Sequence, residues 1–145
     1  MKKEWHKYLI SLGLEEPIIS RAKKLLEIYQ EICNEDILDI FVTEYMDREG
    51  KRNYESMWFF TEKAMMEARE FVYEDDLDYT IYGNNIIYWR MKKENYDYKK
   101  CTTESRMSIE FSLKVRIIAT LRASGNNCKK LKDIFKKHIA CNVIM

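Results

Sequence analysis

The most constraining feature of the sequence is an alternation of apolar side chains that runs from Met107 to Leu121. Every second residue of this segment is apolar, and all but one of the residues between them are polar. A period of two predicts β-structure with one buried and one wet face, and it places Ile117 on the buried face. The 15 residues would span about 50 Å as one strand, so we expect a bend or a connection near Leu113–Lys114, made by a bulge or a three-residue turn.

Two amphipathic helices are predicted ahead of this β-structure. Residues 2–12 carry apolar side chains at helical spacing, and Gly13 follows where a helix can end in the left-handed conformation. Pro17 suits the first turn of a second helix, whose apolar stripe continues to about residue 33. The short joint between the two helices predicts a helical hairpin over residues 1–34.

Residues 37–123 are predicted to form an antiparallel sheet or barrel of about six or seven strands. Runs rich in β-branched and aromatic residues occupy residues 37–45, 54–60, 77–82 and 86–91. The turn Gly83-Asn84-Asn85 between the last two runs predicts that they form a hairpin. Residues 61–72 fit either a helix or a strand, and the neighbouring strands favour a strand.

An amphipathic helix is predicted over residues 127–140, with an apolar stripe on one side and lysines on the others. No linker or repeat divides residues 1–145, so we expect a single α+β domain. Antiparallel strands followed by a C-terminal helix resemble the pleckstrin-homology-like superfold over about residues 37–139. This resemblance, which rests on element order alone, implies a scaffold or adaptor domain that binds peptides or lipid headgroups and has no catalytic machinery.

The composition excludes several classes of protein. With 46% hydrophobic and 13% aromatic residues, the chain is too rich in core-forming side chains to be disordered. No uncharged apolar run approaches the length of about 18 residues that a transmembrane helix needs. The N-terminal residues lack the apolar core of a signal peptide, and the four cysteines lack metal or redox spacing. These features predict a cytoplasmic protein with free thiols.

The sequence contains no recognisable motif for catalysis, a cofactor or a metal. The four glycines are isolated, so a phosphate-binding glycine loop is not expected. The two histidines, His6 and His138, stand in no zinc-binding pattern. We therefore expect a protein that is not an enzyme, with no cofactor and no metal.

The charges are unevenly distributed, although the net charge is only +1. Residues 37–80 carry 5 basic and 12 acidic side chains, whereas residues 81–145 carry 14 basic and 5 acidic ones. Such asymmetry is found in proteins with a surface that binds polyanions. It is also compatible with two segments that pack together and neutralise each other.

Two basic segments provide the candidate binding residues. Residues 88–100 interleave aromatic and basic side chains, as single-stranded nucleic-acid binding sites do, and residues 129–137 are rich in lysine. The candidates are Trp89, Arg90, Lys92, Lys93, Lys129, Lys130 and Lys136. We expect the partner to be a protein or a peptide, which could add to a sheet edge or lie between a strand and the C-terminal helix. The alternative is a nucleic acid or an anionic lipid bound through the two basic segments.

Overall fold

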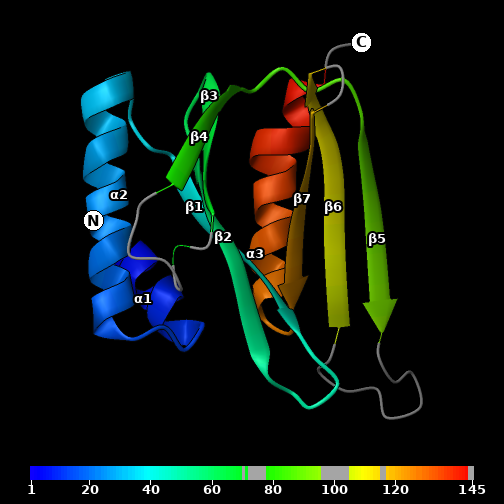
Figure 1. The fold of residues 1–145 in the computed structure, drawn as a ribbon. Helices are drawn as coiled ribbons and strands as arrows, with labels where there is room; N and C mark the ends of the chain where they lie inside the picture. The colour runs from blue at the N-terminus through cyan, green and yellow to red at the C-terminus, as the bar shows by residue number, and fades with distance from the viewer. Residues whose placement is uncertain (70, 72–77, 96–104, 115–116, 144–145) are drawn as a thin grey trace.

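In the described part of the chain, two helices, seven strands and a C-terminal helix are arranged as layers (Figure 1). The structure is a computed structural model, which describes residues 1–69, 71, 78–95, 105–114 and 117–143. The helices are α1 (Lys3–Ser11), α2 (Glu16–Cys33) and α3 (Asn127–Ile134). The strands are β1 (Asp39–Met46), β2 (Arg52–Phe60), β3 (Ala64–Arg69), β4 (Asp78–Gly83), β5 (Trp89–Asn95), β6 (Ser105–Lys114) and β7 (Ile117–Ser124). The α+β class and the antiparallel pairing expected from the sequence are confirmed.

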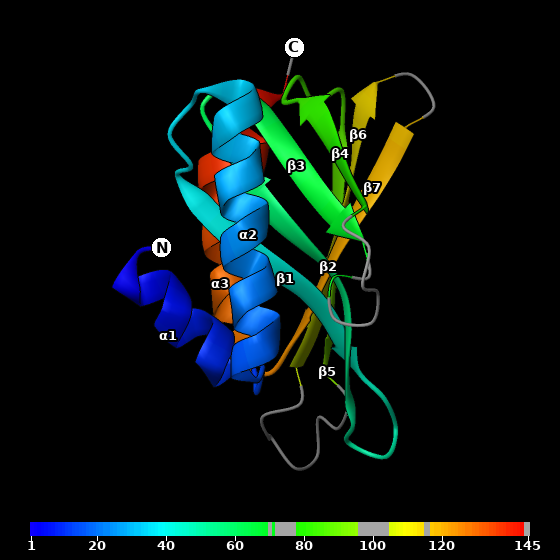
Figure 2. The ribbon, with the colours of Figure 1, turned by 60° about the vertical axis from the view of Figure 1, so that its left-hand side comes forward.

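The first four strands form one antiparallel sheet in the order β1-β2-β3-β4. Both of its faces are buried, because successive residues of β2 point to opposite sides and both sides are apolar. Met57 and Phe59 pack in the core beneath α1 and α2, whereas Trp58 and Phe60 pack in a second core with α3. Figure 2 shows α2 in front of this sheet and α3 behind it.

The last three strands form a second antiparallel sheet in the order β5-β6-β7. Its inner face contributes Ile109, Phe111 and Leu121 to the core that contains Leu131 and Ile134 of α3. Helix α3 therefore lies between the two sheets (Figure 1). Its helical course continues as a π-helical turn, Phe135–Ile139, and a short 3-10 turn, Ala140–Asn142.

The alternating segment is confirmed as β-structure with a break at the expected place. It forms β6 and β7, the pairing shifts register between Ser112 and Lys114, and residues 115–116 lie outside the described residues. The expectation that Ile117 is buried is wrong, since 38% of it is exposed. Ile117 begins β7 at the end of the sheet, where it pairs with Lys114 rather than with a core residue.

The segment that fits both helix and strand is a strand, since Ala64–Arg69 forms β3. The hairpin predicted for residues 77–82 and 86–91 is wrong, because β4 and β5 belong to different sheets. Ile86 between them is fully buried and bridges to Val143 in the C-terminal segment, which fixes the passage from one sheet to the other. None of the helices in the described part of the chain is long and apolar enough to span a membrane.

Candidate functional site

A buried polar network fixes the start of α3 against β1. The Glu44 carboxylate is fully buried and accepts hydrogen bonds from the Ser124 backbone N–H (2.8 Å), the Ser124 hydroxyl (2.7 Å) and the Asn127 amide (3.1 Å). Asn127 in turn accepts a hydrogen bond of 2.7 Å from the Tyr8 hydroxyl. Burial raises the pKa of Tyr8, so its phenol stays neutral and serves as this donor. The network joins α1, β1, β7 and α3 at one end of the molecule.

A second buried carboxylate is Asp39, the first residue of β1, which contacts α3 and the π-helical turn that follows it. Lys130 Nζ is 2.6 Å from Asp39 Oδ1, and His138 Nε2 is 3.3 Å from Asp39 Oδ2. Burial raises the pKa of Asp39, but the hydrogen bonds from His138 and Lys130 outweigh this effect and hold the pKa below its usual range. The His138 ring also stacks on Phe60, with ring centroids 4.9 Å apart. These contacts make Asp39 an anchor that holds α3 in place.

The start of α3 opens onto a cavity of about 650 Å³, which we call the basic cavity. It is lined by Tyr8, Ser11, Leu12, Met46, Arg52, Lys93, Gly125, Asn126, Asn127, Cys128, Lys129, Lys130 and Lys132. Five of these residues are cationic, and none of the described lining residues is acidic. The cavity therefore collects positive charge from β2, β5 and α3.

The structure brings together three of the seven residues chosen from the sequence, Lys93, Lys129 and Lys130, which line the basic cavity. Lys130 is not a free surface lysine, because its ammonium group is bound to Asp39. Lys136 lies further along the chain, in the π-helical turn, and does not line the cavity.

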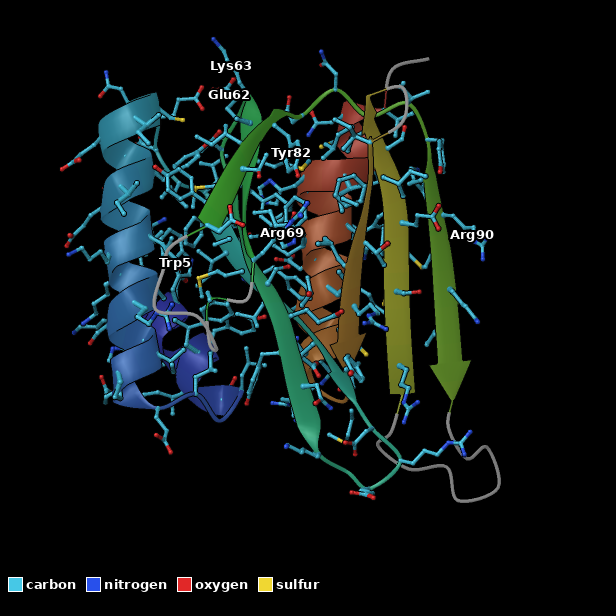
Figure 3. All side chains as sticks on the ribbon, viewed as in Figure 1. Trp5, Glu62, Lys63, Arg69, Tyr82 and Arg90 are labelled. Atoms are coloured by element: carbon cyan, nitrogen blue, oxygen red, sulfur yellow. The ribbon has the colours of Figure 1, made fainter. Side chains whose placement is uncertain are left out.

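Arg90 and Lys92 face away from the basic cavity. They pair across the ladder with Glu110 and Ser108, whereas Lys93 pairs with the buried Met107 on the inner face. Residues that are directly opposite in an antiparallel pair share one face of the sheet. Figure 3 shows Arg90 on the outer side of β5, pointing away from α3.

Trp89, the remaining candidate, lies at the opposite end of β5 from Lys93. Its ring is 42% exposed and packs edge-on against Phe135, with centroids 4.6 Å apart. Met91, the next residue on the same side of the strand, is 38% exposed. We call Trp89, Met91 and Phe135 the edge patch. It is an exposed apolar surface where β5 meets the end of α3.

The acidic and basic segments of the chain do face each other in part. Arg122 of β7 forms an ion pair with Glu55 of β2, and Lys130 forms one with Asp39. Both pairs join the acidic segment, residues 37–80, to the basic segment, residues 81–145. The two segments therefore neutralise each other in part, but among the described residues not every lysine at the basic cavity has an acidic partner.

The seven candidate residues do not include Arg52 and Lys132, which also line the cavity, although Lys132 belongs to the basic segment 129–137. Lys132 follows Lys129 by three residues and so shares its face of α3, a spacing that the sequence already contained. Arg52 reaches the cavity from the start of β2, and its guanidinium also donates to the Leu12 carbonyl at 3.0 Å. No sequence signal linked Arg52 to residues that lie about 40 or more positions away.

Comparisons with known proteins add little to this description. No family model matches the chain, and neither does any curated protein. One similar solved structure is the C-terminal domain of an unknown protein from Leishmania infantum. The two are 9% identical, the match covers 80% of this chain and 95% of that one, and the TM-score is 0.49. A likeness this weak carries no argument about function.

Proposed function

We propose that this chain is a non-enzymatic binding domain that recognises an extended peptide segment of a protein partner along the free edge of β5. The observation that carries the proposal is the edge patch, because an aromatic ring exposed beside an unpaired strand edge is typical of a peptide anchor. We also propose that the chain is related to the pleckstrin-homology-like superfold, a relationship that the element order supports. We include a cytoplasmic location in this proposal, supported by the free thiols of Cys33 and Cys141.

The backbone of β5 supports this mode of binding. Among the strands in the described residues, β5 is the outer one of its sheet. The Ser112 N–H donates to the Tyr88 carbonyl at 3.1 Å, so Tyr88 directs its carbonyl toward β6. Because hydrogen-bonding direction alternates along an antiparallel strand, Trp89, Met91 and Lys93 direct their N–H and C=O groups toward the free edge. A peptide strand would pair with these groups and place alternate side chains against the edge patch.

A peptide-library selection tests the proposal. Peptides enriched on the immobilised full chain are remade and measured by isothermal titration calorimetry against wild type, Trp89→Ala and Ile118→Ala. Ile118 is a matched control, because it is 58% exposed and lies on β7, away from the β5 edge. Loss of an aromatic anchor of about 2 kcal/mol weakens binding roughly 30-fold. Equal affinity of all three proteins for every enriched peptide would refute the edge patch as the anchor.

A pair of proline variants tests the backbone pairing. Met91→Pro removes an N–H that points to the free edge, a position where sheets tolerate proline. Lys92→Pro removes an N–H directed at β6 and should destabilise the sheet. We expect Met91→Pro to keep its cooperative thermal transition and lose the peptide, and Lys92→Pro to lose the transition itself. If a folded Met91→Pro variant retains full affinity, strand addition at β5 is wrong.

A further inference from the structure

The lysines of the basic cavity carry more positive charge than the described residues around them neutralise. Arg52 Nε lies 3.6 Å from the Glu44 carboxylate, and Lys130 is bound to Asp39. Lys93, Lys129 and Lys132 are exposed and have no carboxylate partner among the residues that the structure describes. Three positive charges are thus left to face one concavity.

The position of these lysines increases their need for an anion. Lys129 and Lys132 are three residues apart on one face of α3, where like charges repel and destabilise the helix. Lys129 also stands in the first turn of that helix, whose dipole adds positive potential there. Asn126, which is exposed and also lines the cavity, can donate its amide to an anion's oxygen.

We propose that the basic cavity binds a small soluble molecule that carries two linked phosphate groups. A cavity of about 650 Å³ has the size of an ordinary small-molecule site. Each phosphate group carries about −1.5 to −2 charges at neutral pH, so two of them balance the three lysines. Lysine binds phosphate as a point charge, which suits a ligand held by side chains from β5 and α3 together.

A compact ligand fits the cavity better than a nucleic-acid strand does. A strand requires a track of cations that follows successive phosphates. Here Arg90 and Lys92 lie on the outer face of β5, and Lys136 lies outside the lining of the cavity. Within the described part of the chain, the positive charge gathers at one point instead of along a path. This inference is independent of the proposed peptide site, since neither Trp89 nor Met91 lines the cavity.

Isothermal titration calorimetry of the full chain with sodium pyrophosphate at low salt tests the proposal. The test variant is Lys93→Ala/Lys129→Ala/Lys132→Ala. The control variant, Lys3→Ala/Lys24→Ala/Lys63→Ala, removes the same charge from exposed lysines that do not line the cavity. Lys63 lies at the end of the molecule opposite the start of α3 (Figures 1 and 3). Circular dichroism checks that both variants fold. If the test variant does not fold, Lys129→Glu replaces it.

The expected result is one-to-one binding that the test variant weakens at least tenfold and the control variant changes less than twofold. Trp89→Ala should bind pyrophosphate as wild type does. The proposal is overturned by the absence of saturable binding at millimolar pyrophosphate, or by an equal loss in both triple variants. It is also overturned if inorganic phosphate binds as tightly as pyrophosphate. A single-stranded oligonucleotide whose affinity rises with its length and exceeds that of pyrophosphate would instead make the site a nucleic-acid site.

Discussion

Replacing Glu44 with alanine tests whether the buried polar network positions α3. In wild type this carboxylate has no solvent exposure and accepts three hydrogen bonds, two from Ser124 and one from Asn127. It also faces Arg52 Nε at 3.6 Å, a nitrogen that has no hydrogen-bond partner in the structure. Glu44→Ala removes the acceptor and leaves all of these donors behind.

The expected loss is about 3–5 kcal/mol of the free energy of unfolding, the usual effect of removing one partner of a buried ion pair. Three lost hydrogen bonds to a charged group, at about 1.5–3 kcal/mol each, would together cost about 4.5–9 kcal/mol, most of which lies above this range. Water can offset part of that loss, because Arg52 is 22% exposed and Arg52 and Asn127 line the basic cavity. Against a total stability of about 5–15 kcal/mol, the variant folds but is severely weakened.

Urea denaturation followed by circular dichroism measures the effect, and a thermal melt should show a fall of about 6–20 °C. Glu55→Ala is the matched control, because Glu55 is 31% exposed and pairs with Arg122 near the surface. A surface ion pair contributes about 0–1 kcal/mol, so the control should stay close to wild type. A Glu44→Ala variant within about 1 kcal/mol of wild type, with an unchanged denaturant slope, would refute the structural role of the network.

Three further comparisons of variants test other contacts. Ile109→Asp should lower the free energy of unfolding by at least about 4 kcal/mol because Ile109 is fully buried, whereas Ile117→Asp should change it by about 1 kcal/mol or less. Similar midpoints in urea would contradict the placement of these two residues. Asp39 has a lowered pKa, so its carboxylate adds stability that is fully present above its ordinary value of 3.8 and is lost as the pH falls through the lower folded value. The advantage of wild type over Asp39→Asn in urea should therefore shrink below about pH 4, and an advantage that grows on acidification would reverse this assignment. Lys130→Ala should lower the free energy of unfolding by about 1–3 kcal/mol through loss of the Asp39 contact, whereas Lys136→Ala should leave it nearly unchanged. Equal melting temperatures of the two variants in paired thermal melts would contradict this contrast.

Much of the fold follows from local pattern. The helical spacing of residues 2–12 and 18–33 predicts α1 and α2, because a helix must bury its apolar stripe. The alternation in residues 107–121 predicts β6 and β7 in the same way, including the break near Lys114. In each case a single face of one element determines the pattern, so the pattern can be read without knowing the neighbouring elements.

Pairing between distant elements could not be read from the sequence in the same way. The turn Gly83-Asn84-Asn85 has the composition of a hairpin, yet the chain crosses there from one sheet to the other. Burial of Ile86 against the C-terminal segment overrides the local turn preference, and Val143, its bridge partner, lies 57 residues further along the chain. Similarly, the alternating pattern wrongly predicted that Ile117 is buried, because the pattern contains no information about where the opposing helix ends.

For the candidate site, too, the sequence determined some features and the tertiary structure decided others. By itself the sequence determined that positive charge is concentrated in residues 81–145 and that residues 88–100 interleave basic and aromatic side chains. Only the tertiary structure decided which charges remain available, by placing Lys130 on Asp39 and Arg122 on Glu55 while Lys93 and Lys129 face one cavity. Charge is a property of each residue, whereas neutralisation depends on distances of a few ångströms between residues far apart in the chain. Those distances exist only once β1, β2, β5 and α3 have packed together.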